Sequence, residues 1–218
     1  MLEFKSDKVS AMLESKTTTV GLVFSSGIVL ASDRRASRGM LVSSKVAKKT
    51  IRISDNIYAT ISGLVADAQF LTQLASAIAS YELYENKHKL SPREVAVYLS
   101  HRLFYARPFL YITHLIVAGF SEDGSPQLLN VDLLGMVSDE KYLSTGSGSL
   151  LAFSILEKGY SPDLAEEQAV KLAVEAVKAA ISRDTGTGDG IDVTVITKDG
   201  IKTLSFTVKG ELTEERES

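Results

Sequence analysis

Three consecutive threonines, Thr17, Thr18 and Thr19, follow Lys16 at the start of an apolar run. β-Branched residues favour strands, so the triplet on its own indicates the beginning of an edge strand. A second interpretation requires a cut before Thr17. The α-amine released there has an ordinary pKa of about 7.7–8.0, so a good fraction is unprotonated near neutral pH. On the same residue as a hydroxyl, this amine can take the hydroxyl's proton and make threonine a nucleophile.

Such a nucleophile needs support from other parts of the chain. A nearby cation lowers the pKa of the amine and of the hydroxyl. A backbone N–H must face the developing oxyanion, and carboxylates and hydroxyls must orient the terminus. Polar segments that contain these groups are SDRR at 32–35, KVAKKT at 45–50, SGLVADAQ at 62–69, STGSGS at 144–149 and SRDTGTGDG at 182–190.

Each polar segment also has an ordinary interpretation when it is taken singly. Residues 32–35 suit a solvated strand end, and residues 45–50 suit a basic surface loop. Residues 144–149 suit a turn or a weak anion nest before a helix, but they lack the lysine of a phosphate-binding loop. Residues 182–190 suit a helix end capped by glycines. The joint occurrence of the segments in this order favours the catalytic interpretation.

Composition narrows the chemistry that remains. The 218 residues contain no cysteine and three scattered histidines, His88, His101 and His114. We therefore expect no thiol nucleophile and no metal cluster, and catalysis that needs neither metal nor cofactor. The formal net charge of -3 provides no basic surplus for nucleic acid. No segment resembles a signal peptide or a membrane span, so we expect a cytoplasmic protein.

Apolar periodicity predicts the elements that position these segments. Strand patterns occupy residues 19–25, 28–33, 50–63, 111–120, 126–135, 136–145, 191–197 and 201–208. Helical patterns occupy residues 67–84, a segment that begins at Ser91, and residues 149–158 and 163–183. Pairs of helices between runs of strands argue against alternating parallel βα units and favour antiparallel sheets covered by helix pairs. We therefore expect one α+β domain.

Three local features refine this prediction. The apolar residues at helical spacing within 67–84 are Phe70, Leu71, Leu74, Ile78 and Leu83. Ser91, Pro92 and Glu94 form the pattern of a capping box, with Ser91 as the N-cap residue. The polar segment 209–218 is expected to be a frayed tail after the last strand.

In their order, the threonine triplet and the polar segments resemble β-type subunits of the proteasome core particle, closest to the archaeal kind, which are N-terminal-nucleophile hydrolases. The resemblance is carried by TTTVG at 17–21, SDRR at 32–35, SGLVADAQ at 62–69, STGSGS at 144–149 and RDTGTG at 183–188. It implies a four-layer αββα sandwich of two antiparallel sheets flanked by helix pairs. The implied organisation is a propeptide at 1–16, the domain at 17–208 and a polar C-terminal tail at 209–218.

The resemblance implies roles for individual residues. Thr17 matches the nucleophile, Asp33 the acid that orients the amine and the lysine, and Lys49 the catalytic lysine. Gly63 matches the residue whose backbone N–H forms the oxyanion hole. The hydroxyl and carboxylate groups around the terminus are matched by Ser147, Asp184 and Thr187. Thr187 stands where the family usually has serine, and it keeps the hydroxyl.

Substrate preference and assembly are implied in the same way. The pocket for the side chain before the scissile bond is matched by Ala36, Ala47, Ile51, Ile61, Val65 and Gln69. This small, apolar and uncharged set implies cleavage after hydrophobic residues. Ser37 matches a position whose backbone aligns the substrate as an added strand. The family implies stacked seven-membered rings with α subunits and other β subunits, unfolded polypeptides as substrates and an ATP-dependent unfoldase.

Lys16 departs from the family pattern, which usually has glycine before the nucleophilic threonine. Self-cleavage at Lys16–Thr17 needs a tight turn that glycine reaches without the Cβ penalty of lysine. Lysine also adds bulk and charge beside Lys49. Two alternatives follow: a threonine endopeptidase that matures slowly or only with another β subunit, or an unprocessed structural or regulatory subunit beside an active paralogue. The related bacterial two-component threonine peptidase fits less well, because the segment around Asp184 and the long C-terminal hairpin suit a proteasome β subunit.

Overall fold

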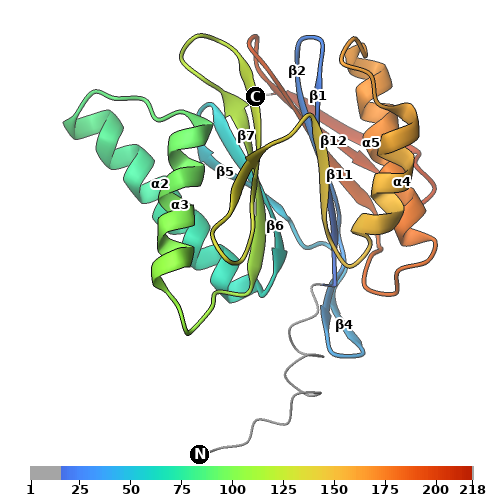
Figure 1. Cartoon of the computed structure of the whole chain (residues 1–218). Helices are drawn as coiled ribbons and strands as arrows, with labels where there is room; N and C mark the ends of the chain where they lie inside the picture. Colours follow the sequence, from blue (N-terminus) through green and yellow to red (C-terminus); the bar gives the residue numbers. More distant parts are fainter. Residues whose placement is uncertain (1–15, 218) are drawn as a thin grey trace, which may run out of the picture.

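Two antiparallel sheets stack face to face, and each carries a pair of helices on its outer side in the computed structural model (Figure 1). The structure describes residues 16–217. The four layers confirm the predicted α+β sandwich. Residues 1–15 of the predicted propeptide lie outside the described residues.

The predicted elements occur in the expected order, and three strands that were not predicted, β3, β4 and β13, are added to them. One sheet contains β1 (Thr18–Phe24), β2 (Gly27–Asp33), β10 (Tyr142–Gly146), β11 (Ile191–Thr197), β12 (Ile201–Phe206) and β13 (Leu212–Glu217). The other contains β5 (Thr50–Ser54), β6 (Ile57–Gly63), β7 (Thr113–Phe120), β8 (Pro126–Val131) and β9 (Val137–Asp139). A separate hairpin is formed by β3 (Ala36–Arg38) and β4 (Leu41–Ser44). The helices are α2 (Val65–Glu85), α3 (Pro92–Tyr105), α4 (Ser149–Gly159) and α5 (Glu166–Ile181).

The six-stranded sheet has the order β10-β1-β2-β11-β12-β13, so β1 and β2 lie near its centre. Both faces of β2 are buried. Val29 and Ala31 pack in the core that includes residues of α4 and α5, while Ile28 and Leu30 pack in the core between the sheets. Because side chains of a strand alternate between faces, burial of both faces explains the continuous apolar run in β2. Asp33 ends this strand.

The capping box at the start of α3 is confirmed. The Ser91 hydroxyl accepts a hydrogen bond from the Glu94 N–H at 3.2 Å, and the Glu94 carboxylate accepts one from the Ser91 N–H at 2.8 Å. Pro92 occupies the first turn of the helix, where its missing N–H costs no hydrogen bond.

The apolar face predicted for 67–84 is only partly buried. Leu71 is buried, but Phe70 and Leu83 are exposed. The residues of α2 that face the sheet are mostly small: Ala68, Leu71, Thr72, Ala75 and Ala79. Small side chains at spacings of three and four let the helix lie close to the sheet, and this displaces the larger residues to the outer face.

The segment predicted as one strand over 136–145 is two strands in different sheets. β9 pairs with β8, whereas β10 pairs with β1. The chain passes between the sheets at Glu140, whose N–H donates to the Leu128 carbonyl, and Lys141, whose carbonyl accepts from the Val23 N–H. The backbone of Glu140 is thus bonded to one sheet and that of Lys141 to the other. Because buried backbone groups need partners, the segment divides here into two strands, although its sequence pattern is continuous.

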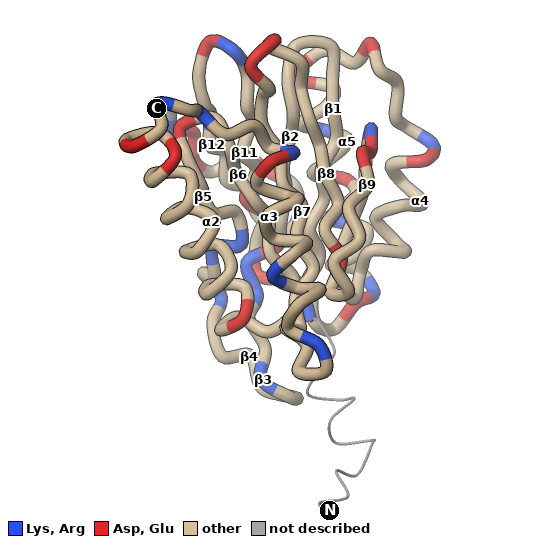
Figure 2. The backbone as a smooth tube through the Cα atoms, turned by 60° about the vertical axis from the view of Figure 1, so that its left-hand side comes forward, with Lys and Arg blue, Asp and Glu red and all other residues tan. Residues whose placement is uncertain are grey.

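The C-terminal segment also differs from the prediction. Most of 209–218, expected to be a frayed tail, forms β13 and pairs antiparallel with β12. Its charged side chains suit an edge strand, because charge at an open edge opposes pairing with other chains. Figure 2 shows both signs of charge interspersed over the described chain. Among residues 16–217, no helix combines the length and apolar character needed to cross a membrane.

Candidate active site

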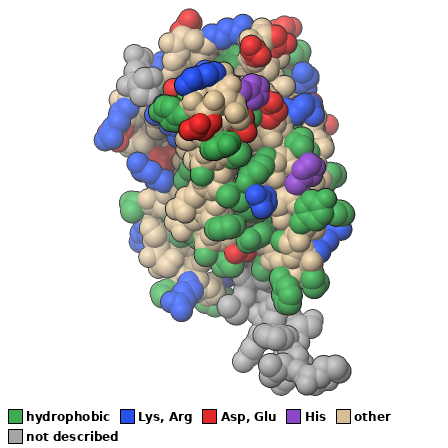
Figure 3. Space-filling model, turned by 90° about the vertical axis from the view of Figure 1, so that its left-hand side faces the viewer, with side chains coloured by type: hydrophobic (Ala, Val, Ile, Leu, Met, Phe, Trp, Pro, Cys, Tyr) green, Lys and Arg blue, Asp and Glu red, His purple; other side chains and the backbone are tan. Residues whose placement is uncertain are grey.

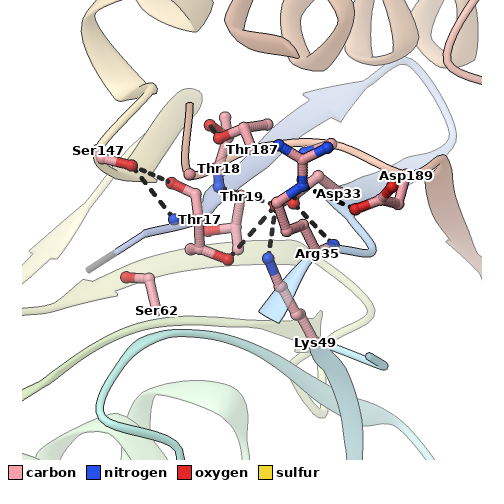
Figure 4. A network of polar contacts seen from close by, with 12 residues as sticks. Thr17, Thr18, Thr19, Asp33, Arg35, Lys49, Ser62, Ser147, Thr187 and Asp189 are labelled. Carbon is pink, nitrogen blue, oxygen red and sulfur yellow. Dashed lines mark hydrogen bonds and ion pairs between the residues drawn. The ribbon is translucent and has the colours of Figure 1, made fainter. Parts of the chain in front are cut away.

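The side chain of Asp33 is fully buried at the end of β2 and connects several of the predicted site residues (Figure 4). Its Oδ1 atom accepts hydrogen bonds from the Lys49 ammonium at 2.6 Å, the Thr18 N–H at 3.0 Å and the Thr17 hydroxyl at 3.3 Å. The predicted nucleophile and the predicted lysine therefore share one carboxylate oxygen.

The second carboxylate oxygen of Asp33 is held by the backbone. Oδ2 accepts hydrogen bonds from the N–H groups of Arg35 and Gly188, each at 3.0 Å. Gly188 belongs to the segment between α5 and β11, more than a hundred positions away in the chain. Backbone donors have fixed positions, so they orient the carboxylate toward Thr17 and Lys49.

Lys49 immediately precedes β5, and its side chain is 8% exposed. Burial lowers the pKa of Lys49 from its ordinary value, and the attraction of Asp33 offsets part of this effect. The Ile61 N–H donates to the Lys49 carbonyl at 2.9 Å, which ties the backbone of Lys49 to β6. A cation is thus held beside the Thr17 hydroxyl in an environment poor in water.

A second group of polar residues surrounds the nitrogen of Thr17. The Thr17 N–H donates to the Ser147 hydroxyl at 3.2 Å, and this hydroxyl donates to Asp184 at 2.6 Å. The Thr187 hydroxyl also donates to Asp184, and it lies 2.7 Å from the Thr18 hydroxyl. Ser147 therefore contacts Thr17 directly, whereas Asp184 contacts Ser147 and Thr187 contacts Thr18.

Gly146 allows this second group to approach. Its φ is +96°, and a Cβ placed there would lie 2.2 Å from the Thr17 carbonyl oxygen and 2.8 Å from the Thr17 methyl. Any other residue would therefore push the turn between β10 and α4 away from Thr17. Gly146 therefore allows the backbone to pass close to Thr17.

A cavity of about 520 Å³ opens beside Thr17. It is lined by all seven residues predicted for substrate binding: Ala36, Ser37, Ala47, Ile51, Ile61, Val65 and Gln69. Gly63 lines the same cavity. Its φ is +111°, and a Cβ would lie 2.3 Å from the Ile112 carbonyl oxygen, so this position requires glycine.

The cavity is broader than the predicted apolar pocket. Lys16, Arg35, Lys48 and Lys49 also border it, and its described lining includes no carboxylate. Two serines of β4, Ser43 and Ser44, complete its wall. The lining therefore combines apolar side chains with four cationic ones.

Lys16 has its own partners in the uncleaved chain. Its ammonium donates to the carbonyl of Gly39, in the turn between β3 and β4. Its Cβ lies against Gly186, where an added methyl would be 2.6 Å away. Lys16 and Lys49 line the same cavity, and their ammonium groups have separate acceptors, the Gly39 carbonyl and Asp33.

Two side chains at this site were not in the predicted set. Arg35 and Asp189 form an ion pair at 2.7 Å next to Asp33 (Figure 4). Both belong to quoted segments, 32–35 and 182–190, but nothing in the sequence indicates that they pair. The only sequence feature that draws attention to Asp189 is the abundance of aspartate and glycine in residues 182–190.

A sequence model of the family described as "Proteasome subunit" matches residues 14–196 of this chain. The chain belongs to the proteasome subunit family. The resemblance inferred from the threonine triplet and the polar segments is thereby confirmed.

Similar proteasome proteins share most of their length with this chain. It is 46% identical over 194 residues to "Proteasome subunit beta 1" of Korarchaeum cryptofilum, covering 89% of this chain and 94% of the relative. It is 47% identical to "Proteasome subunit beta 2" of Hyperthermus butylicus, covering 88% and 90%. It is 43% identical to "Proteasome subunit beta" of Methanocaldococcus vulcanius, covering 87% and 85%. Within the proteasome family, the chain is of the β type.

Proposed function

We propose that this proteasome β subunit is a threonine endopeptidase whose nucleophile, Thr17, is released by cleavage of the Lys16–Thr17 bond. One observation carries the proposal. The Thr17 hydroxyl and the Lys49 ammonium share Oδ1 of Asp33, while the Thr17 nitrogen faces Ser147. Both the oxygen and the nitrogen of one threonine thus have the polar neighbours that an N-terminal nucleophile needs.

Release of Thr17 needs one acyl transfer and one hydrolysis. The Thr17 hydroxyl oxygen attacks the carbonyl carbon of Lys16, and the C–N bond breaks as the nitrogen gains a proton. The product is an ester of Lys16 on the threonine oxygen and a free α-amine on Thr17. Water then hydrolyses the ester, so that residues 1–16 leave with a new carboxylate and the hydroxyl is restored.

The released amine then acts as the base. It takes the hydroxyl proton of Thr17 as Oγ1 attacks the substrate carbonyl carbon, and it gives that proton to the departing amine. The N–H of Gly63 stabilises the oxyanion, and water hydrolyses the acyl ester. Lys49 keeps the pKa of the amine and of the hydroxyl low, and Asp33 keeps Lys49 charged.

The cavity suits hydrophobic side chains. Ile51, Ile61 and Val65 line it together with cationic side chains, and its described lining contains no carboxylate. Apolar residues before the scissile bond are favoured, whereas lysine and arginine meet like charge. Within residues 16–217, β3 pairs only with β4, so its other edge is open to an extended peptide that Ser37, which lines the cavity, can align as an added strand.

The outer surface fits assembly with other subunits. Exposed apolar side chains of α2, α3 and the following segment include Phe70, Phe104, Tyr105, Phe109 and Leu110. Figure 3 shows hydrophobic side chains gathered on this face. Contiguous apolar surface is a mark of protein contacts. We infer partners among α subunits and other β subunits in stacked seven-membered rings that receive unfolded polypeptides from an ATP-dependent unfoldase.

The second candidate function is an unprocessed structural or regulatory subunit beside an active paralogue. The contacts of Lys16 with Gly39 and Gly186 favour it, because they hold the residue before Thr17 in place. The numbered names of relatives, such as beta 1 and beta 2, suit particles with more than one β chain.

Intact mass and N-terminal sequencing of the chain, alone and co-assembled with its α and β partners, separate the two functions. We expect the assembled particle to contain a chain that begins at Thr17, because assembly completes the site. Particles that contain this cleaved chain should hydrolyse peptides with a hydrophobic residue before the scissile bond. Persistence of residues 1–16 in every copy of the particle refutes the peptidase and supports the structural role.

Lys16→Gly is expected to speed cleavage before Thr17 by about tenfold, equivalent to about 1.4 kcal/mol in the barrier. The change removes the ammonium–Gly39 contact and the Cβ against Gly186, and it relaxes the backbone restriction. The measurement is a time course of intact mass during assembly. Lys16→Met is the matched control, since it keeps the bulk without the charge. Unchanged processing in Lys16→Gly means that Lys16 does not limit maturation.

A further inference from the structure

We propose that Arg35 and Asp189 form a latch that positions the segment 183–189, here called the 183–189 loop, around Thr17. Neither residue belongs to the predicted catalytic set, and both act through other residues. The proposal rests on the proposed peptidase function for its effect on the reaction. Its geometric part, that the ion pair holds the loop, does not depend on activity.

Arg35 contacts the loop at two points. Its Nε donates to Oδ2 of Asp189 at 2.7 Å, and its Nη1 donates to the Thr185 carbonyl at 3.0 Å. The guanidinium also lies on Gly188, where an added Cβ would be 2.4 Å from Nη2. The planar fork of arginine reaches separate acceptors at once, whereas lysine provides a single point charge.

The loop in turn presents several groups to Thr17 and its neighbours. Asp184 accepts from Ser147, which faces the Thr17 nitrogen, and Thr187 contacts the Thr18 hydroxyl. The Gly188 N–H donates to Asp33 at 3.0 Å. Gly186 lies against Lys16, the residue before the bond to be cut.

The loop has little regular structure of its own to hold these groups. Residues 182–190 contain turns and bends between α5 and β11. Asp189 has a φ of +66°, in the left-handed region that a non-glycine residue adopts at a cost. Hydrogen bonds from the Gly186 N–H and the Thr187 hydroxyl to Asp184 order part of the loop from within. The side chain of Arg35 adds two hydrogen bonds from outside, to Thr185 and Asp189. Placement errors of about 1 Å in such a support are enough to reduce catalysis strongly.

The chain offers a matched control for the latch. Arg34, the preceding residue, pairs with Asp192 of β11, its Nε donating at 2.8 Å. The exposed fractions are similar: 24% and 22% for this pair, 25% and 15% for Arg35 and Asp189. Arg34 therefore matches Arg35 in charge and in partial burial, and both residues follow the end of β2. The side chain of Arg34, however, pairs with Asp192 in strand β11 and not with the 183–189 loop.

The test uses the assembled particle with wild-type chain or the variants Arg35→Gln, Asp189→Asn, the double variant, Arg35→Lys and Arg34→Gln. Asparagine also tolerates the left-handed conformation, so Asp189→Asn removes charge with little backbone strain. Two quantities are measured: kcat and KM on a fluorogenic peptide with a hydrophobic residue before the cleaved bond, and amide hydrogen exchange of residues 183–189.

We expect Arg35→Gln and Asp189→Asn each to lower kcat by about 10- to 100-fold, because the pair positions the supports of the nucleophile. The KM of Asp189→Asn should stay within about twofold, because Asp189 does not line the substrate cavity whereas Arg35 does. Faster exchange of the 183–189 loop accompanies the loss of kcat. The kcat of the double variant should lie within about twofold of that of either single variant, because the two residues act as a unit. Arg35→Lys recovers part of kcat, and Arg34→Gln changes neither quantity.

Three results overturn the latch. Unchanged exchange in Arg35→Gln means that the pair does not hold the loop, whatever the activity. Faster exchange with unchanged kcat means that the loop does not position the nucleophile. An equal loss of kcat in Arg34→Gln means that Arg35 has only a general structural role. If the wild-type chain retains residues 1–16 and cleaves no peptide, the proposed peptidase function fails, and exchange alone still decides whether the pair holds the loop.

Discussion

Thr17→Ala is expected to abolish peptide hydrolysis, with kcat lower by at least about 10⁴-fold, because no other group replaces the attacking oxygen. The fold is expected to survive. The Thr17 hydroxyl makes one long hydrogen bond to Asp33, at 3.3 Å, while the neighbouring Thr18 N–H keeps its own bond to the same oxygen. Turnover of a hydrophobic fluorogenic peptide by the assembled particle measures the loss. The same variant should also retain residues 1–16, because the hydroxyl performs both reactions.

Thr17→Ser is the matched control for this prediction. Serine keeps the hydroxyl and, once released, the α-amine, but it lacks the methyl that packs against Gly146. Its kcat should stay within about tenfold of the wild-type value, as expected for lost positioning alone. Substantial hydrolysis by Thr17→Ala, in particles that contain no other active β chain, would contradict the assignment of Thr17 as nucleophile.

Asp33→Asn is expected to affect both activity and stability. The buried carboxylate accepts hydrogen bonds from Thr17, Thr18 and Lys49 through one oxygen and from two backbone N–H groups through the other. In asparagine, the NH₂ group takes the place of one carboxylate oxygen and faces N–H or O–H groups that need an acceptor. The buried Lys49 ammonium also loses the charge of Asp33. Removal of one partner of a buried ion pair costs about 3–5 kcal/mol in the free energy of unfolding.

The same substitution should remove most of the peptidase activity. Burial already lowers the pKa of Lys49, and loss of the Asp33 charge removes the strongest attraction that opposes this shift and leaves the weaker one of Asp184. Lys49 then tends to be neutral, and the amine and hydroxyl of Thr17 lose their cation. We expect kcat to fall by about 10³-fold or more. Chemical denaturation of the full chain and turnover by the assembled particle measure the two effects.

Asp192→Asn provides the comparison for Asp33→Asn. Asp192 is likewise the acidic partner of an ion pair, with Arg34, and it accepts a hydrogen bond from the Ser205 hydroxyl. Unlike Asp33, it is partly exposed. Its loss should cost about 1 kcal/mol or less and should leave kcat unchanged. Similar effects of the two substitutions would mean that Asp33 is an ordinary structural carboxylate.

Local sequence patterns were enough to predict most elements of the sandwich. Periodicity and capping depend on residues a few positions apart, so the capping box at Ser91 and the buried run of β2 were visible without a structure. Patterns failed where a distant neighbour decides the outcome. The split between β9 and β10 depends on which sheet satisfies each backbone group, and β13 forms because β12 presents an open edge.

Most side chains that the structure brings together at the candidate site could be named from the sequence. The resemblance named Thr17 and Lys49, which donate to Asp33, the pair Ser147 and Asp184, and seven lining residues of the cavity, but not the backbone donors to Asp33. It could do so because each segment carries a recognisable combination of hydroxyl, charge and glycine. Whether Thr17 acts as a nucleophile stays a prediction that the proposed experiments test.

The contacts that hold these segments together could not be predicted from the sequence. Arg35 and Asp189 are 154 positions apart, and the chain offers many other arginines and aspartates as partners. The acceptor of the Lys16 ammonium, the Gly39 carbonyl, is a backbone group that no side-chain pattern reveals. Residue types show which interactions are possible, but a contact between distant residues forms only after the chain between them has closed. Here β2 pairs with β11 in one sheet, with Asp33 opposite Ile191, and this brings Arg35 and Asp189 together just beyond the two strand ends.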